Sequence, residues 1–283
     1  MKIEEFPSRI VLELTPRCNL SCPMCPRHYI KDTDGYMSEW LFKKLVNEIV
    51  AENPEAVVLP FWRGESCLHP EFHSFLNYAL DQGLRIHLST NGHFMGQEQM
   101  AVFYRCEFVT FSLHTVIGYR NARKFIDQKP SWSNTISQVS FVDSEADSRK
   151  FLADCTEDNY LMGFDAVRLY VEHTVGGEFG KSIMPAVADR SFCPKLTHTF
   201  VVGADGGYSR CNHLWQTQKD PGLTSASIRE IWEGEVMNEI KSSYPDEHCG
   251  HCDQWSGHTS GEAWRKDASG RVEHMAYGIP NEL

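Results

Sequence analysis

The sequence predicts an α/β protein built on a parallel sheet, with a smaller cysteine-rich region after it. Short apolar runs typical of buried strands alternate with longer segments whose apolar residues recur at helical spacing. When a helix divides each strand from the next, the strands are expected to lie parallel and to be joined by right-handed crossovers. This pattern fits an open sheet and a sheet curled into a partial barrel equally well.

The expected elements follow one another in regular order. A first strand at 10–14 leads into a loop rich in cysteine, and Ser38 is placed to cap a helix that carries Leu41, Leu45 and Ile49. Further strands are expected at 56–61, 84–89, 107–113, 135–142 and 165–172, and the helices between them at 70–82, 96–105, 117–127 and 146–161.

Two of the later strands are apolar on one face only. Val109, Phe111 and Leu113 alternate with polar residues, and the strand at 165–172 repeats the pattern. A polar face inside a helix-covered sheet needs hydrogen-bond partners, which a bound polar ligand would supply; a solvated edge strand is the alternative. The candidate substrate contacts on these strands are His114, Arg168, Tyr170 and Glu172.

Three cysteines directly follow the first strand, as Cys18-Asn-Leu-Ser-Cys22-Pro-Met-Cys25. Three thiolates can ligate three irons of a 4Fe-4S cluster and leave the fourth iron open to another ligand. A structural zinc site completed by His28 is the alternative, because zinc accepts the same ligand types. Zinc sites, however, favour paired Cys-x2-Cys knuckles over a tandem triplet.

The cysteine loop resembles the signature of the radical S-adenosylmethionine (radical SAM) superfamily. The resemblance implies a partial (β/α)6 barrel in which Cys18, Cys22 and Cys25 hold a 4Fe-4S cluster and SAM binds the open iron. In that family the reduced cluster cleaves SAM to a 5'-deoxyadenosyl radical, which abstracts a hydrogen atom from the substrate. An electron donor such as flavodoxin or ferredoxin is implied as a partner.

The family's residues for SAM match this chain in part. Arg63-Gly64-Glu65-Ser66 resembles the segment that receives the SAM amino group, with Arg63 and Ser66 departing from the family's glycine and proline. The resemblance implies that Glu65, Ser89, Asn91 and Ser112 bind SAM, and Arg63 is free to contact substrate instead. The family's glycine-bearing adenine motif is not evident at 139–142.

A second cysteine set lies beyond a glycine-rich stretch at 173–180. It comprises Cys193, Cys211, Cys249 and Cys252 around an expected hairpin at 199–209 and a helix capped by Ser227. From spacing alone, zinc and a second 4Fe-4S cluster remain equally open. The order of elements resembles the twitch domain, a shortened SPASM domain with an auxiliary cluster. The expected division is 1–180 for the barrel, 181–255 for the twitch domain and 256–283 for a tail.

Composition narrows the class of partner. A formal net charge of -11 argues against nucleic acid, and no stretch has the length of a membrane span. The N-terminus lacks the apolar core of a secretory signal, so a cytoplasmic protein is expected, whose thiols serve as ligands or reactive groups.

The resemblance favours a dehydrogenase that acts on a small hydroxylated or amino-bearing molecule, with the auxiliary cluster as electron acceptor. An epimerase with Cys67 as hydrogen-atom donor, a peptide-modifying maturase and a non-catalytic zinc-binding module are the alternatives. For the maturase, the segment before Cys18 is expected to be too short for a separate peptide-recognition domain.

Overall fold

The structure is a computed structural model that describes residues 3–31, 33–142, 148–156, 161–170, 192–252 and 261–276. The chain divides into two compact units. The first unit comprises Met1–Ser21, Cys25–Ile86 and His173–Gly257, and the second comprises Cys22–Met24, His87–Glu172 and His258–Leu283. The domain boundary expected near residue 180 lies outside the described residues and stays a prediction.

The sheet of the first unit is parallel at its centre. Strand β1 (Arg9–Leu12) pairs in parallel with β2 (Val57–Leu59) on one side and with β7 (Thr199–Val202) on the other. Beyond β2 comes the start of β3 (Arg85–Thr90), and β7 pairs antiparallel with β8 (Tyr208–Ser209). The hairpin expected at 199–209 therefore continues the sheet that begins at β1.

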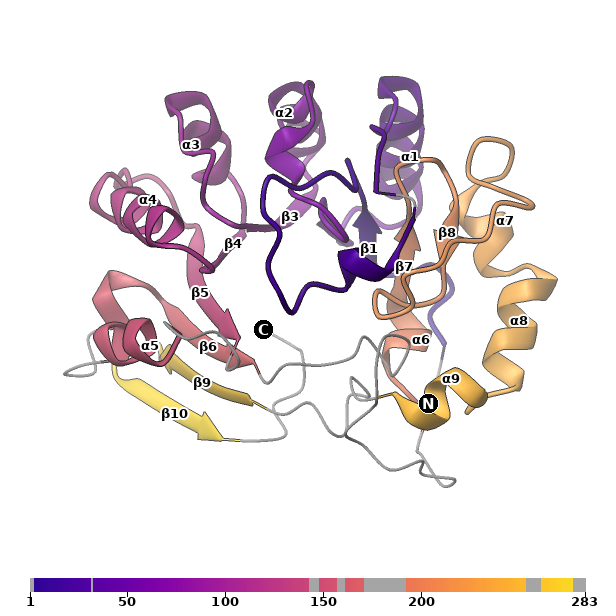
Figure 1. The fold of residues 1–283 in the computed structure, drawn as a ribbon. Helices are drawn as coiled ribbons and strands as arrows, with labels where there is room; N and C mark the ends of the chain where they lie inside the picture. The colour runs from indigo at the N-terminus through magenta and orange to yellow at the C-terminus, as the bar shows by residue number, and fades with distance from the viewer. Residues whose placement is uncertain are drawn as a thin grey trace. The chain divides into compact units, whose positions relative to one another are not determined.

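Helices of the first unit cover one face of this sheet (Figure 1). Ser38 caps α1 (Glu39–Glu52) by accepting the Leu41 N–H, as its position in the sequence predicts. Phe42 of α1 stacks on Phe75 of α2 (Phe72–Asp81), with ring centroids 4.3 Å apart. These two helices bury the side of β1 and β2 that carries Ile10 and Val58.

The cysteine-rich part of the first unit contains four short helices. These are α6 (Lys195–His198), α7 (Ile228–Trp232), α8 (Glu235–Ser242) and α9 (Glu247–His251). A capping box of Ser227 and Glu230 begins α7. The ion pair between Arg229 and Glu52, and the Arg229 N–H bond to Glu48, fasten α7 to α1.

The second unit continues the strand and helix alternation. The rest of β3 pairs in parallel with β4 (Phe108–Ser112), β4 with β5 (Ile136–Val142), and β5 with β6 (Ala166–Tyr170). The helices of this unit are α3 (Gln97–Phe103), α4 (Val116–Asp127), α5 (Ser148–Thr156) and the 3-10 turn η4 (Leu161–Gly163). Phe111, Phe125 and Tyr104 form its aromatic core, with Phe111 and Phe125 centroids 5.1 Å apart.

The tail contains a hairpin that the sequence analysis leaves undecided. Strand β9 (Gly261–Lys266) pairs antiparallel with β6, and β10 (Val272–Ala276) pairs antiparallel with β9 (Figure 1). The tail thereby covers the hydrogen-bonding edge of β6, which would otherwise be open to another chain. Among the described residues, no helix has the length and apolarity needed to cross a membrane.

Candidate functional site

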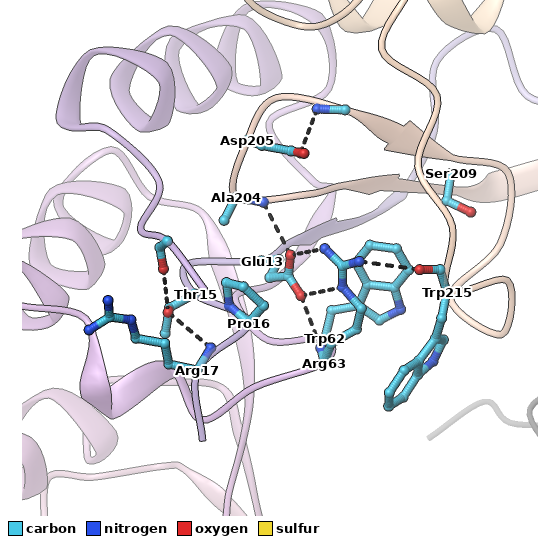
Figure 2. Close-up of polar contacts among 12 residues, drawn as sticks. Glu13, Thr15, Pro16, Arg17, Trp62, Arg63, Ala204, Asp205, Ser209 and Trp215 are labelled. Atoms are coloured by element: carbon cyan, nitrogen blue, oxygen red, sulfur yellow. Dashed lines mark hydrogen bonds and ion pairs between the residues drawn. The ribbon is translucent and has the colours of Figure 1, made fainter. Parts of the chain in front are cut away.

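The first cysteine loop is held by hydrogen bonds before and after it. The Thr15 hydroxyl donates to the Gly35 carbonyl at 2.7 Å and accepts the Arg17 N–H at 3.1 Å (Figure 2). The Arg27 guanidinium, in the turn η1 (Pro26–Tyr29) after the last cysteine, donates to the Pro16 carbonyl at 3.0 Å. These bonds fix the two ends of the loop that carries Cys18, Cys22 and Cys25.

Gly64 brings the segment after β2 into close contact with this loop. A β-carbon at position 64 would lie 2.3 Å from the Thr15 carbonyl oxygen and 2.4 Å from that of Arg17. No side chain fits between these two stretches of backbone, so only glycine allows the Glu65 N–H to donate to the Arg17 carbonyl at 2.7 Å. The contact places Glu65 beside the start of the cysteine loop.

Cys18 lies in an environment that other thiols and charges of the first unit create. Burial raises the pKa of the Cys18 thiol, and the Glu65 carboxylate and the Cys25 thiol raise it further. The Leu20 N–H and the Arg27 guanidinium oppose the rise in that pKa. Cys18, Cys25 and Glu65 are therefore within electrostatic range of one another, and all three cysteines of the loop are partly exposed.

Glu65 and Cys67 share a short 3-10 turn, η2 (Ser66–Leu68). Glu65 is 3% exposed, and its carboxylate accepts the Cys67 N–H at 3.2 Å. The Ser66 hydroxyl donates to the Pro60 carbonyl, while the Cys67 thiol is partly exposed. The turn thus holds a buried carboxylate and an accessible thiol two residues apart.

Arg63 is engaged by a buried carboxylate, which sequence reasoning missed. The guanidinium donates from Nε to Glu13 Oε1 at 2.7 Å and from Nη2 to Oε2 at 2.5 Å, with the Glu13 side chain 0% exposed (Figure 2). Glu13 also accepts the Ala204 N–H at 3.2 Å, and Arg63 Nη1 donates to the Trp215 carbonyl at 3.2 Å. An acidic residue in the apolar run 10–14 was the available signal, because a buried charge requires a partner.

The second cysteine set is also assembled within the first unit. Cys193 and Cys252 are buried, whereas Cys211 and Cys249 are partly exposed. Burial raises the pKa of both the Cys211 and Cys249 thiols, and each thiol raises the other set members' pKa where they interact, Cys193 acting on Cys211 and Cys211 on Cys249. Cys193, Cys211 and Cys249 therefore lie in one electrostatic neighbourhood.

The residues around these thiols fit an anionic metal cluster. In the part of the chain that the structure describes, no three His, Cys, Asp or Glu side chains are arranged as a closed site for a single metal ion. Beside Cys211 and Cys249, the buried Nε–H of Arg210 has no hydrogen-bond partner among the described residues. A cationic donor left over next to thiols suits the sulfur atoms of an iron-sulfur cluster, whose hydrogen bonds are part of its environment.

The second unit presents a polar row on β3, β4 and β5. The Ser89 and Ser112 hydroxyl oxygens lie 3.2 Å apart, and those of Ser112 and Ser140 lie 3.3 Å apart. Val109, Phe111 and Leu113 are buried, so the predicted alternation on β4 is confirmed. Asn91, which is buried, accepts the His93 N–H at 3.0 Å and shapes the turn after β3.

The candidate substrate residues of the second unit are partly placed. The Arg168 guanidinium lies 4.4 Å from the centroid of the Tyr170 ring on β6, and both side chains are partly buried, as is His114 after β4. Glu172 lies outside the described residues. The structure therefore brings Arg168 and Tyr170 together and leaves the predicted role of each of these residues a prediction.

No family model matches the chain. A stretch of 92 residues is 33% identical to the tungsten-containing aldehyde ferredoxin oxidoreductase cofactor-modifying protein of Pyrococcus furiosus, covering 32% of this chain and 26% of that protein. A stretch of 87 residues is 30% identical to the S-adenosylmethionine-dependent nucleotide dehydratase of Selenomonas ruminantium, covering 31% of each. The chain thus matches less than a third of the length of these relatives.

Solved structures match over most of the chain. BtrN in complex with AdoMet and 2-DOIA has a TM-score of 0.64 at 16% identity, covering 89% of this chain and 94% of BtrN. Streptococcus suis SuiB bound to its precursor peptide SuiA has a TM-score of 0.64 at 12% identity, covering 88% of this chain and 70% of SuiB. The sulfatase-maturase-like structure anSMEcpe with bound AdoMet has a TM-score of 0.58 at 14% identity, covering 83% and 82%.

These matches confirm the fold class that the sequence analysis reached through resemblance. The sheet is mixed but mostly parallel and matches the partial TIM barrel of radical SAM structures, and proteins of the SPASM and twitch group are among its neighbours. Structures with this fold that contain AdoMet imply a 4Fe-4S cluster and SAM as cofactors. The chain has the fold of a radical SAM enzyme.

Proposed function

We propose that this chain is a radical SAM dehydrogenase of a small hydroxylated or amino-bearing substrate, with two 4Fe-4S clusters. Cys18, Cys22 and Cys25 would hold the SAM-cleaving cluster, and the second set would hold the auxiliary one. The observation that carries the proposal is the second set itself, where buried thiols meet a cationic donor left without a partner among the described residues. The match to BtrN, a dehydrogenase, over 94% of that protein supports it.

When bound, the clusters and SAM would supply a 5'-deoxyadenosyl radical to remove a substrate hydrogen atom and an acceptor for the electron left behind. The chain's own residues would position the reactants. Glu65, a buried carboxylate within range of Cys18, suits the SAM ammonium, and Ser89, Asn91 and Ser112 are kept as SAM contacts. His114, Arg168, Tyr170 and Glu172 are kept as substrate contacts.

For Arg63 we propose a structural role in place of the substrate contact that the sequence predicts. Its Nε, Nη1 and Nη2 atoms each donate to protein oxygen atoms, and its guanidinium carbon lies 4.3 Å from the centroid of the Trp62 ring. A guanidinium held in this way is poorly placed to change partners, because its release would leave the Glu13 charge buried and unpaired.

Replacement of the first three cysteines tests the two cluster assignments together. Cys18→Ala, Cys22→Ala and Cys25→Ala combined should abolish 5'-deoxyadenosine formation and leave one cluster of iron, ~4 atoms per chain. SAM cleavage by the triple variant would refute the first assignment. Loss of all iron from the variant would refute the second, and zinc in place of iron in the unmodified protein would favour the zinc-binding module.

An epimerase is the second candidate, and the partly exposed thiol of Cys67 favours it. A thiol can return a hydrogen atom to a carbon radical, whereas the stronger O–H bond of serine cannot do so readily. Cys67→Ser keeps the size of the side chain, so an epimerase should still cleave SAM but should lose the inverted product and its solvent deuterium. Normal turnover of the variant to an oxidised product would leave the dehydrogenase as the assignment.

The size of the substrate is a separate question. BtrN was solved with 2-DOIA and SuiB with a precursor peptide, and both share this fold. Incubation with SAM and either polyol and amino-cyclitol substrates or peptides, followed by mass spectrometry, separates the two classes. A mass loss of two hydrogen atoms from a small substrate supports the dehydrogenase, and a modified peptide supports a maturase.

A further inference from the structure

Arg210 occupies a buried position between two segments of the second cysteine set. It immediately precedes Cys211, its side chain is 8% exposed, and its Nη1 donates to Asp246. Its Nε–H is buried and has no hydrogen-bond partner in the part of the chain that is described. A buried guanidinium N–H without an acceptor is costly, so a partner outside the polypeptide is expected.

Asp246 connects Arg210 to the next cysteine. One carboxylate oxygen, Oδ1, accepts the Cys249 N–H at 2.9 Å and caps α9, while the other, Oδ2, accepts from Arg210. The ion pair therefore ties the segment that carries Cys211 to the helix that carries Cys249. It also aligns the guanidinium with the side of α9 on which the thiols gather.

The thiols on both sides experience the charge of Arg210. The pKa of Cys211 and that of Cys249 are raised mainly by burial, and Arg210 acts against the rise in both cases. Arg210 therefore stabilises negative charge on both sulfur atoms. A cluster ligated by four thiolates is anionic, and it becomes more negative on reduction.

We propose that Arg210 is a positioning residue that donates its Nε–H to a sulfur atom of the auxiliary cluster and raises the midpoint potential of that cluster. The inference rests on the proposed function, since it requires a cluster at the second cysteine set. The couple concerned takes up one electron, from the oxidised to the reduced cluster. Positive charge and a hydrogen bond to sulfur both favour the reduced state, which makes the cluster a better acceptor of the substrate's electron.

The test measures the auxiliary cluster alone. In the background of Cys18→Ala, Cys22→Ala and Cys25→Ala, only the second set can hold iron, and its potential can be followed by EPR during an anaerobic redox titration. Iron per chain is measured on each sample. The variants are Arg210→Gln, Arg210→Lys and Asp246→Asn, with the exposed Arg120→Gln as control.

Opposite shifts are expected from the two sides of the ion pair. Arg210→Gln removes a positive charge and should lower the ratio of reduced to oxidised cluster about tenfold at a fixed ambient potential, or ~59 mV for one electron. Asp246→Asn keeps an N-cap but removes a negative charge, so its potential should rise. Arg210→Lys should lie between Arg210→Gln and the parent, and Arg120→Gln should match the parent.

The outcomes separate the inference from the function beneath it. A parent potential in Arg210→Gln with full iron content, or shifts in the same direction for Arg210→Gln and Asp246→Asn, would overturn the inference and leave the cluster assignment standing. If Arg210→Gln loses iron, Arg210→Lys and Asp246→Asn decide by the same criterion. Absence of iron from the background variant would overturn the proposed function and the inference together.

Discussion

Removal of the Arg63 guanidinium should be among the most destabilising single changes in the first unit. Glu13 is 0% exposed and accepts three bonds from Arg63, two from the guanidinium and one from the backbone N–H at 3.3 Å. Arg63→Met would leave this carboxylate buried with only backbone donors. Breaking one side of a buried ion pair costs about 3–5 kcal/mol in the free energy of unfolding.

The double variant distinguishes the lost partner from lost packing. Arg63→Met combined with Glu13→Leu leaves no buried charge, so it should recover at least ~2 kcal/mol relative to Arg63→Met alone. The free energy of unfolding would be measured anaerobically by urea denaturation, with tryptophan fluorescence and circular dichroism as probes. As a control, Asp127→Asn breaks an exposed pair with Arg123 on α4 and should cost about 0.5 kcal/mol or less.

Two results would refute this reasoning. If Arg63→Met costs no more than Asp127→Asn, then Glu13 does not depend on Arg63 for its charge. If the double variant is as unstable as the sum of both single variants, then the two side chains are not energetically coupled. Either result would return Arg63 to the list of candidate substrate contacts.

Two further predictions concern the same unit. Gly64→Ala should lower the free energy of unfolding by about 1–3 kcal/mol and reduce iron in the first cysteine set, because its methyl group would overlap the Thr15 carbonyl; Gly250→Ala, where the methyl group meets open space, should not lower stability, and equal losses would contradict the argument. Burial lowers the pKa of Lys241, which lies over the Trp232 ring, to about 8. Since the unfolded chain then binds more protons between pH 8 and 10.5, the stability of the protein relative to Lys241→Met should rise by about 1 kcal/mol from pH 7.5 to 9.5 in urea denaturation, and a constant difference would contradict that pKa.

The strands and helices could be predicted from the sequence because their signals are local. The β4 strand illustrates this, since Val109 and Phe111 alternate with Thr110 and Ser112 and the burial follows the same period. Likewise, Ser38 and the Leu41 spacing identify the start of α1, and the structure confirms it. Periodicity and capping act within a few residues, so the sequence contains them in full.

Pairing between distant segments could not be predicted in the same way. Strand β9 has no apolar alternation in Gly261–Lys266, and it forms because β6 offers its backbone edge. The pairing of β7 with β1 likewise joins Phe200 to Ile10, and nothing near either residue specifies the other. The partners of Arg210 and Arg63 depend on such long-range placement, so only the presence of buried charges, not their pairing, was open to sequence reasoning.

The two departures from the family's SAM segment are explained by local contacts on either side of Gly64 and Glu65. Arg63, in place of a glycine, pairs with Glu13 at the end of β1, and Ser66, in place of a proline, bonds to the Pro60 carbonyl. Gly64 meanwhile lies against the backbone of the cysteine loop. The departures therefore do not remove the segment's ability to present a carboxylate; they replace the rigidity of proline and the close approach of glycine with an ion pair and a hydroxyl bond. Since Glu13 also binds the Ala204 N–H and Arg63 the Trp215 carbonyl, the segment with Glu65 is anchored to the hairpin and loop around Cys211, so a change at the second cysteine set has a direct physical route to the first.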